Sequence, residues 1–333
     1  MDPLTQGVFG AIAAQIPADK SQLGKASLVG ALSGMAADLD ILIRSANDSL
    51  LALEFHRHFT HSLLFIPIGG ALCATFFYLC FAKRWQLGFK PFWLWCTLGY
   101  ATHGLLDGCT SYGTRLLWPL TDERFAWDLV SVIDPIFSAI LLFLILAAIF
   151  RRNHRYSIAA VAWIGFYLGL AAIQHGRALD WGYQLAESRG HKIDRLHAKP
   201  SFGNIEVWKI IYESDGRFYI SAYRPGIIES KSWAGESVAK LDVARDFPWL
   251  NLESQQALDI ERFREFSSGF VALDPNNSSK IGDIRYSQLP HQIQPLWAIE
   301  LNPQANNNEH ARYVTQRGGN RETFEQLLAM ILE

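Results

Sequence analysis

The stretch that decides the fold is residues 63–82, LLFIPIGGALCATFFYLCFA, which carries no charged side chain. A helix needs about 20 apolar residues to cross the hydrocarbon core of a bilayer, so this stretch predicts a transmembrane helix. Residues 56–62, HRHFTHS, lie directly before it and contain three histidines. The sequence leaves three alternative explanations for these histidines: they form a metal site, a pH-sensitive surface, or a polar collar at the lipid interface.

Three further segments are predicted as membrane spans on their length and apolar character: residues 91–106, 135–150 and 157–174. Basic residues follow the first span and separate the last two, whereas the loop 107–130 is acidic on balance. Basic loops face the cytoplasm in most membrane proteins. We therefore expect a multi-pass protein whose loop 107–130 and C-terminal half, after residue 175, lie on the non-cytoplasmic side.

The two halves of the chain differ in composition. Of the 333 residues, 50% are hydrophobic and only 19% are charged, and the long apolar runs all lie in the first half. Residues 4–16 and 24–37 are rich in Gly, Ala and Ser and predict a helical hairpin packed through small side chains. The expected fold is a mainly α membrane-embedded helical bundle, residues 1–176, followed by a soluble α+β domain, residues 177–333.

The C-terminal half has the patterns of mixed helices and strands. Residues 206–225 predict a β-hairpin, because aromatic and β-branched runs flank the turn-forming pair Asp215-Gly216. Residues 302–311, NPQANNNEHA, predict a loop. Further strands are expected at 269–275 and 296–302, and helices at 254–266 and 321–333.

Charge and cysteine usage exclude several classes of protein. The net charge of -2 and the absence of a basic stripe argue against a nucleic-acid partner. The four cysteines have no CxxC spacing, which argues against a zinc ribbon or a redox motif. The N-terminal MDPLTQGVFG lacks a basic region, so we expect no cleaved signal peptide.

Acidic and histidine side chains gather at the predicted outer ends of the apolar segments. His103 and Asp107, in HGLLD, are four residues apart and therefore share one face of a helix. Imidazole together with carboxylate suits zinc, manganese or iron. Ionisable groups at membrane depth are costly and usually functional. The side chains at this depth are Asp38, Asp40, His61, His103, Asp107 and Asp134.

Each of these residues also has a plainer interpretation. His103 and Asp107 resemble an ordinary packing pair on a helix, and the DLD of residues 38–40 resembles a helix cap. Asp134 precedes a proline and fits the cap of a helix. His58 fits an interfacial histidine better than a ligand. Their coincidence at one depth is what favours a shared cation site.

Five stretches of the first half occur in the order of a known family: MDPLTQGVFGAIAAQ (1–15), GMAADLDIL (34–42), HRHFTHSLLF (56–65), HGLLDGCTSYGTRLLWPLTDERFAWD (103–128) and VIDPIF (132–137). In these motifs the chain resembles the YdjM-like proteins, described as LexA-binding, inner-membrane-associated, metal-dependent hydrolases. This family is grouped with zinc-dependent phospholipase C and P1-type nucleases. The resemblance implies a bacterial inner-membrane location.

The resemblance also implies a set of metal ligands, with zinc as the expected ion. Ala37 stands where the family usually has proline, and His58 replaces a customary glycine. Gln6 stands where some relatives carry histidine, so either one or two ions are expected. The implied ligands are Asp38, Asp40, His56, His61, His103 and Asp107.

Two functions follow as hypotheses. In the first, a membrane-bound metallohydrolase activates water, with Asp134 or Asp40 as general base. Arg115 then steadies an anionic phosphoryl oxygen and Tyr112 donates a hydrogen bond to it. The location next to membrane lipid suggests a lipid or lipid-linked phosphoester as substrate. In the second, the metal is structural and the C-terminal domain recruits a partner.

Overall fold

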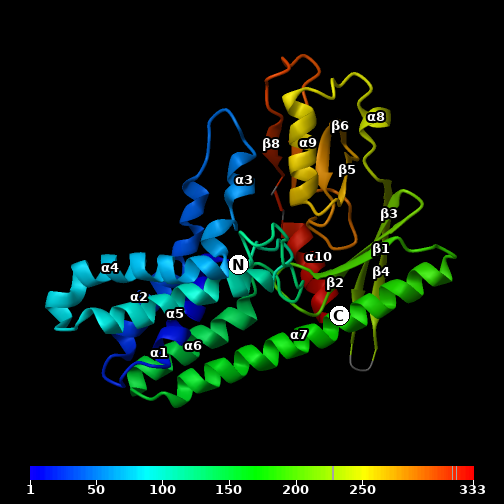
Figure 1. The fold of residues 1–333 in the computed structure, drawn as a ribbon. Coiled ribbons are helices and arrows are strands. Elements are labelled where there is room, and N and C mark those ends of the chain that lie inside the picture. Colours follow the sequence, from blue (N-terminus) through cyan, green and yellow to red (C-terminus); the bar gives the residue numbers. More distant parts are fainter. Residues whose placement is uncertain (227–228, 317, 320) are drawn as a thin grey trace. The chain divides into compact units, whose positions relative to one another are not determined.

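The computed structural model describes residues 1–226, 229–316, 318–319 and 321–333, and the chain divides into two compact units (Figure 1). The boundary expected at 176/177 falls inside one long helix, which belongs to both units. The helical unit contains Met1–Leu42, Phe55–Ala172 and Phe202–Asn204, and the C-terminal unit contains Ile43–Glu54, Ile173–Ser201 and Ile205–Glu333.

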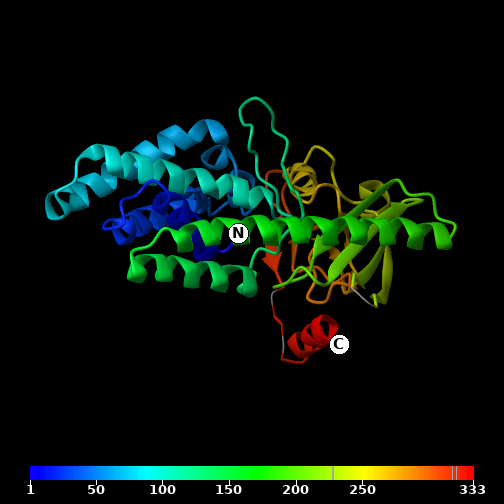
Figure 2. The same cartoon turned by 90° about the horizontal axis from the view of Figure 1, so that it is seen from below.

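Every apolar segment predicted from the sequence is a helix in the structure, as the ribbon of Figure 2 also shows. The predicted spans and the predicted hairpin are therefore confirmed as helices. The long helices are α1 (Pro3–Gln15), α2 (Leu23–Gly34), α4 (Ile66–Trp85), α5 (Phe89–Gly108), α6 (Pro135–Arg151) and α7 (Arg155–Ser188). Short helical turns are η1 (Ala36–Leu42), α3 (Leu51–Phe55), η2 (Phe59–His61) and η3 (Leu63–Phe65).

Two of these helical segments are long and apolar enough to cross a bilayer among the residues that the structure describes: Leu63–Trp85 and Arg155–Ser188. Only 22% of the most apolar stretch of each is buried, unlike the core helix of a soluble protein. The helix α7 has 34 residues and is about 51 Å long at 1.5 Å per residue. It therefore extends beyond a hydrocarbon core of about 30 Å, well past the expected end at residue 174.

The hairpin of α1 and α2 packs through glycines, as its composition predicts. The Asp2 side chain caps α1 by accepting a hydrogen bond from Thr5 N at 3.1 Å. A Cβ atom on Gly30 would lie 2.4 Å from Ala14 Cβ and 2.5 Å from Gly10 O. A Cβ on Gly99 of α5 would lie 2.4 Å from Gly30 O. The three backbones therefore approach more closely than any side chain allows.

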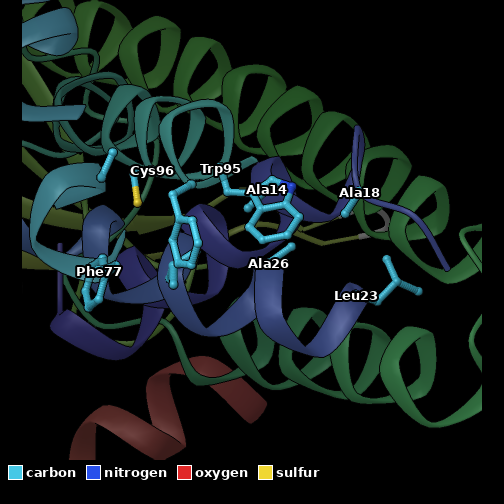
Figure 3. Close-up of a cluster of buried hydrophobic side chains, with 10 residues drawn as sticks. Ala14, Ala18, Leu23, Ala26, Phe77, Trp95 and Cys96 are labelled. Carbon is cyan, nitrogen blue, oxygen red and sulfur yellow. The ribbon is translucent and has the colours of Figure 1, made fainter. Parts of the chain in front are cut away.

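Behind these contacts lies one apolar cluster shared by four helices (Figure 3). The rings of Phe92 and Trp95 from α5 fill it, and both are almost fully buried. Small side chains of α1 and α2, such as Ala14 and Ala26, leave room for these rings. The cluster fixes the helices along their length, and so fixes where their polar ends meet.

The C-terminal unit contains two antiparallel sheets, with the strand orders β1-β2-β3-β4 and β5-β6-β7-β8. The predicted hairpin is confirmed, and its turn residues Asp215 and Gly216 have positive φ angles of 49° and 67°. The other strands and helices predicted in this half, and the loop at 302–311, are also present. The strands are β1 (Arg195–Pro200), β2 (Trp208–Ser214), β3 (Arg217–Arg224), β4 (Lys231–Ala239), β5 (Val271–Asp274), β6 (Asn277–Asp283), β7 (Trp297–Glu300) and β8 (Arg312–Thr315), and the helices are α8 (Val243–Asp246), α9 (Gln255–Phe266) and α10 (Arg321–Leu332).

The close contact of α2 predicts different effects for alanine at two glycines of that helix. Gly30→Ala forces a methyl group into the backbone of α1, so we expect a loss of about 1–3 kcal/mol in the free energy of unfolding. Gly24→Ala meets only Ile149 Cγ2, at 3.6 Å, and should be neutral or stabilise by up to about 1 kcal/mol. Thermal unfolding in detergent measures both, and equal midpoints for the two variants would contradict this packing.

Candidate metal centre

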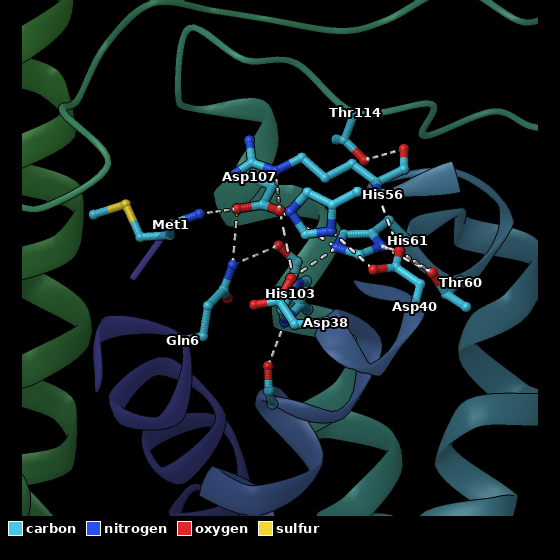
Figure 4. A network of polar contacts seen from close by, with 12 residues as sticks. Met1, Gln6, Asp38, Asp40, His56, Thr60, His61, His103, Asp107 and Thr114 are labelled. Carbon is cyan, nitrogen blue, oxygen red and sulfur yellow. Dashed lines mark hydrogen bonds and ion pairs between the residues drawn. The ribbon is translucent and has the colours of Figure 1, made fainter. Parts of the chain in front are cut away.

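Six imidazole and carboxylate side chains from three separate segments meet at one end of the helical unit (Figure 4). The first segment is η1, which follows α2. The second is the stretch before α4 that includes η2, and the third is the C-terminal end of α5. The structure thereby brings together all the ligands that the family resemblance implied: Asp38, Asp40, His56, His61, His103 and Asp107.

Four of these residues form a tight inner group. His61 Nε2 lies 3.4 Å from both Asp38 Oδ1 and Asp107 Oδ2. His103 Nε2 lies 3.2 Å from Asp38 Oδ1 and 3.7 Å from Asp107 Oδ2. Ligands at about 2.0–2.2 Å from a tetrahedral zinc ion are about 3.3–3.6 Å apart, and these four distances lie close to that range. All four atoms lie within 4.8 Å of one another, so one cation could contact them all.

The hydrogen bonding of the inner group leaves these atoms pointing at one another. His61 Nε2 and Asp107 Oδ2 are buried and make no hydrogen bond of good geometry. Such unsatisfied atoms are costly in a protein interior, and a cation would satisfy both. His103 Nδ1 donates to the carbonyl of Gly34, which leaves Nε2 with its lone pair facing the group.

Asp40 holds the other nitrogen of His61. Its Oδ2 lies 3.2 Å from His61 Nδ1, and Thr60 Oγ1 donates to the same oxygen at 2.8 Å. This carboxylate–imidazole pair orients the ring as metal-bound histidines require.

A second group of ligand atoms consists of Asp38, Asp40 and His56. His56 Nδ1 lies 2.8 Å from Asp40 Oδ1. Asp38 belongs to both groups, as a carboxylate does when it bridges two ions. The side chains of His56 and Asp38 are 32% and 27% exposed, whereas the other three ligands of the inner group are buried. The second group is therefore the accessible edge of the centre.

The three carboxylates govern the electrostatics of the site. Burial opposes the charged form of His61, but its close contacts with these carboxylates, at 3.2–3.4 Å, outweigh burial and raise the pKa of His61 to about 10. Burial likewise opposes charge on Asp40, but its contacts with His56 and His61 hold the pKa of that carboxyl well below its usual range. The proton on His61 thus balances negative charge that a divalent cation would also balance.

Arg57 is a member of the site that the sequence analysis did not single out. Its Nε lies 3.1 Å from Asp107 Oδ2, and its NH1 donates to Thr110 Oγ1 at 3.0 Å. Its backbone N–H donates to Asp40 Oδ2 at 3.1 Å, and its φ angle is 64°. A non-glycine residue in this region is strained, and such strain concentrates at functional sites. The only signal in the sequence was its place between two ligand histidines.

Two groups near the N-terminus also contact the inner group. Gln6 Nε2 donates to Asp107 Oδ1 at 2.9 Å. Gln6 stands where some relatives carry histidine, and here it contacts a candidate ligand without being one itself. The amino group of Met1 pairs with the same oxygen. Both contacts leave Asp107 Oδ2 facing the two imidazoles.

The structure does not bring Asp134 to the centre, so we no longer consider it as the general base. Its Oδ1 accepts from Phe137 N at 3.1 Å and caps α6, and its Oδ2 accepts from Tyr167 at 2.6 Å. Arg115 donates from its backbone N–H to the carbonyl of Arg57 at 3.2 Å, but its side-chain NH1 pairs with the exposed Asp122 at 3.0 Å. The ring of Tyr112 lies under the guanidinium of Arg57, 5.2 Å from it.

The three histidines of residues 56–62 therefore have two different surroundings. His56 and His61 lie in the ligand groups. The ring of His58 packs 5.4 Å from that of Trp118, and His58 belongs to neither ligand group. The metal-site explanation therefore stays a prediction for His56 and His61, and the collar explanation stays one for His58.

Comparison with known proteins identifies the family of the first half of the chain. Residues 1–178, more than half of the chain, match the family of YdjM inner membrane proteins. The chain belongs to this family. The match covers all six ligand positions and the helices that carry them, and it supports a location in the inner membrane.

Two curated relatives are similar over part of their length. The inner membrane protein YbcI of Escherichia coli (strain K12) is 33% identical over 108 residues, which is 31% of this chain and 60% of YbcI. The uncharacterized protein YfhP of Bacillus subtilis (strain 168) is 27% identical over 114 residues, 34% of each chain. The chain thus matches less than two thirds of either relative. No solved structure matches the chain.

The shared position of Asp38 predicts the metal content of two variants. Asp38→Ala removes a ligand from both groups, so zinc-saturated, desalted protein should lose both ions. His56→Ala should lose only the ion of the second group. Elemental analysis of the purified proteins measures this, with Asp134→Asn as a control for a buried acid outside the centre. Equal metal content in all variants would contradict the ligand assignment.

The raised pKa of His61 predicts opposite pH trends for the two forms of the protein. In metal-free protein the charged imidazole stabilises the fold fully below about pH 6.5, and this stabilisation is lost as pH rises toward 10. Zinc requires the neutral ring, so its apparent affinity should rise about tenfold per pH unit for one displaced proton. Calorimetry in buffers of different ionisation enthalpy measures that proton. Affinity that does not depend on pH, or proton release unchanged in His61→Gln, would contradict this assignment.

Proposed function

We propose that the protein is a membrane-bound, metal-dependent hydrolase of a lipid or lipid-linked phosphoester. The observation that carries the proposal is the pair of ligand groups that share Asp38, one buried and one at the accessible edge. A structural zinc site is closed by four ligands, whereas a catalytic site keeps an open position. Six ligand-type side chains with one exposed edge fit the second arrangement better.

Zinc is the ion that this donor set favours, since imidazole and carboxylate at tetrahedral spacing suit it. The inner group would hold one ion, and Asp38, Asp40 and His56 would hold the other. Ions bound in this way lower the pKa of water toward neutrality and offset charge on a phosphoryl group. The proposed likeness to zinc-dependent phospholipase C and P1-type nucleases rests on this chemistry.

The residues at the accessible edge would handle the proton. Asp40 is the candidate general base, binding the second ion through one oxygen and accepting the proton on the other. Its pKa lies below the usual range, so it is ionised at neutral pH but is a weak base, and it would take a proton only from water that a bound cation has acidified. The exposed ring of His56, 2.8 Å from Asp40, leaves this edge open to the solvent that takes up the proton. In the reaction, water forms the new O–P bond, the bond to the leaving oxygen breaks, and the leaving oxygen takes up a proton.

Arg57 replaces Arg115 as the residue proposed to bind the phosphoryl oxygens. The Arg57 side chain is 7% exposed, and its guanidinium is oriented by Asp107, Thr110 and the ring of Tyr112. Since Nε and NH1 contact Asp107 and Thr110, the guanidinium would donate from NH2 to a phosphoryl oxygen. The ion pair of Arg115 with the exposed Asp122 occupies it elsewhere.

Exposed apolar side chains alternate with the ligands of η1 and favour an amphiphilic substrate. Leu39 and Ile41 are 64% and 56% exposed, whereas Asp38 and Asp40, which each precede one of them, belong to the ligand groups. Leu64, just before α4, is 57% exposed. Exposed apolar side chains at the edge of a membrane helix fit the lipid interface better than water.

The distribution of basic residues completes the proposal. It favours a multi-pass protein whose centre and C-terminal unit lie on the non-cytoplasmic side of the inner membrane. A substrate would then enter sideways from the outer leaflet.

An assay with two substrates tests this function. We expect the detergent-solubilised protein to hydrolyse a short-chain phospholipid in micelles faster than bis(p-nitrophenyl) phosphate. A chelator should abolish turnover and zinc should restore it. Absence of turnover on both substrates, or turnover that survives chelation, would contradict the proposal. If chelation instead only unfolds the helical unit, the structural-metal hypothesis is favoured.

Removing the charge of Arg57 should separate catalysis from metal binding. Arg57→Met should lower kcat/KM by about 10²–10³-fold, the usual cost of losing a donor to an oxyanion, while metal content remains that of the wild type. Arg115→Met, which removes a guanidinium outside the centre, serves as the control. Equal losses in the two variants would show that Arg57 has no special role.

A further inference from the structure

A threonine hydroxyl links the two ligand groups of the metal centre (Figure 4). Thr60 Oγ1 donates to Asp40 Oδ2 at 2.8 Å and lies 3.0 Å from His61 Nδ1. Asp40 Oδ2 and His61 Nδ1 are themselves 3.2 Å apart, so the three atoms form a triangle. His61 belongs to the inner group and Asp40 to the second group. One side chain that is not a candidate ligand therefore contacts a ligand of each group, and all three residues lie in the helical unit.

The chemistry of the hydroxyl fixes the direction of these contacts. A carboxylate only accepts hydrogen bonds, so the one proton of the Thr60 hydroxyl points to Asp40. The lone pairs of Thr60 Oγ1 are then left for a proton on His61 Nδ1. A neutral ring with its proton on Nδ1 has its lone pair on Nε2, the nitrogen that faces Asp38 and Asp107. Thr60 thus holds the form of His61 that binds a cation in the inner group.

The main chain of Thr60 is held independently of its hydroxyl. Tyr100, on α5, donates from its side chain to the carbonyl of Thr60 at 2.8 Å. Thr60 is the middle residue of the turn η2, which is closed by the hydrogen bond from Ser62 N to Phe59 O at 3.2 Å. Removing the hydroxyl therefore leaves these backbone contacts in place and tests the side-chain contacts alone.

Two partners compete for the carboxylate of Asp40. Its Oδ1 lies 2.8 Å from His56 Nδ1 and faces the second group, whereas its Oδ2 contacts His61 and accepts from Arg57 N at 3.1 Å. A cation bound at Oδ1 withdraws negative charge from the whole carboxylate, so Oδ2 becomes a weaker acceptor for His61 Nδ1. The proton on Nδ1 then needs a second acceptor, and Thr60 Oγ1 lies at hydrogen-bond distance from it.

We propose that Thr60 is a positioning residue that lets the two ions bind together: its hydroxyl supplies an acceptor for His61 when Asp40 binds the second ion. The inference rests on the proposed two-ion centre. With an ion in the inner group only, the Asp40 carboxylate serves His61 by itself. With both ions bound, the Thr60 hydroxyl keeps the His61 ring in the orientation that the inner ion requires. The hydroxyl therefore matters for binding of the second ion, although Thr60 is a ligand of neither.

The test compares two threonines that each precede a ligand histidine. Thr60→Val removes the hydroxyl and keeps the branched shape. Thr102→Val, beside His103, removes a hydroxyl that donates at 2.8 Å to Gly99 O of the same helix. Zinc titration of the full-length protein in detergent should show the second ion about 10–100-fold weaker in Thr60→Val, the usual cost of losing an outer contact, and the first ion unchanged. Thr102→Val should bind both ions as the wild type does.

A variant without the second group isolates the coupling. His56→Ala removes a ligand of that group only. In this background Thr60→Val should not change the affinity of the remaining ion, because no second ion then withdraws charge from Asp40. Cobalt substitution provides a spectroscopic readout. The absorption band of the first cobalt ion should change more in Thr60→Val than in the wild type when the second ion binds.

Conservative variants guard against a simple effect on folding. Thr60→Ser keeps the hydroxyl and should restore most of the affinity for the second ion, whereas Thr60→Ala should behave as Thr60→Val does. The Ser and Ala variants differ by the hydroxyl alone, so this pair decides the question even if valine does not fit in the turn. Thermal unfolding of the metal-free variants identifies any general loss of stability.

The outcomes separate this inference from the proposed function. Wild-type affinity for both ions in Thr60→Val and Thr60→Ala would overturn the role of Thr60, even if the wild type is an active hydrolase. Equal weakening of both ions, or a weaker remaining ion in the His56→Ala background, would also overturn it, because either result indicates a general structural role. Two ions coupled through Thr60 without hydrolysis would overturn the proposed function and leave this inference standing. A wild type that binds fewer than two ions would overturn the inference.

Discussion

The structure depends on keeping three carboxylates and three imidazoles together at the end of a bundle that is otherwise apolar. Each of these charges alone would be costly to bury, and even more so beside lipid. The arrangement is tolerable because every carboxylate faces an imidazole or Arg57, and because a bound cation would satisfy His61 Nε2 and Asp107 Oδ2. The buried charged groups that lower the stability of the metal-free protein are the same groups that would bind the metal.

Close packing of helix backbones brings these groups within reach of one another. A Cβ on Gly104 would lie 2.2 Å from the carbonyl of His61, so only glycine lets α5 approach this turn. Tyr100, one turn earlier, donates to the carbonyl of Thr60 at 2.8 Å. The carbonyl of Gly34, at the end of α2, accepts from His103. Glycines that permit helix packing thus lie beside the residues that form the centre.

The candidate site could be predicted where chemistry is visible in the residues themselves. His103 and Asp107 share a helix face by spacing alone, and His61 lies at the same predicted depth, whereas His56 was implied only by the family resemblance. Arg57 was missed because no sequence pattern around a single arginine indicates its contacts with Asp107, Thr110 and Asp40. Asp134 fits both a cap and a base in the sequence, because it is a carboxylate before a proline, and its hydrogen bonds with Phe137 and Tyr167 show the cap.

The sequence by itself determined the helices of the first half, the strands of the second and the residue types that gather at the membrane boundary. Local propensity, apolar run length and turn chemistry suffice for these features. Only the tertiary structure decided that Asp38 serves two ligand groups, that α7 runs through the expected domain boundary, and that Ile43–Glu54 belongs to the C-terminal unit. Such features arise from contacts between residues far apart in the chain, such as Glu54 with Arg262, and no local pattern encodes them.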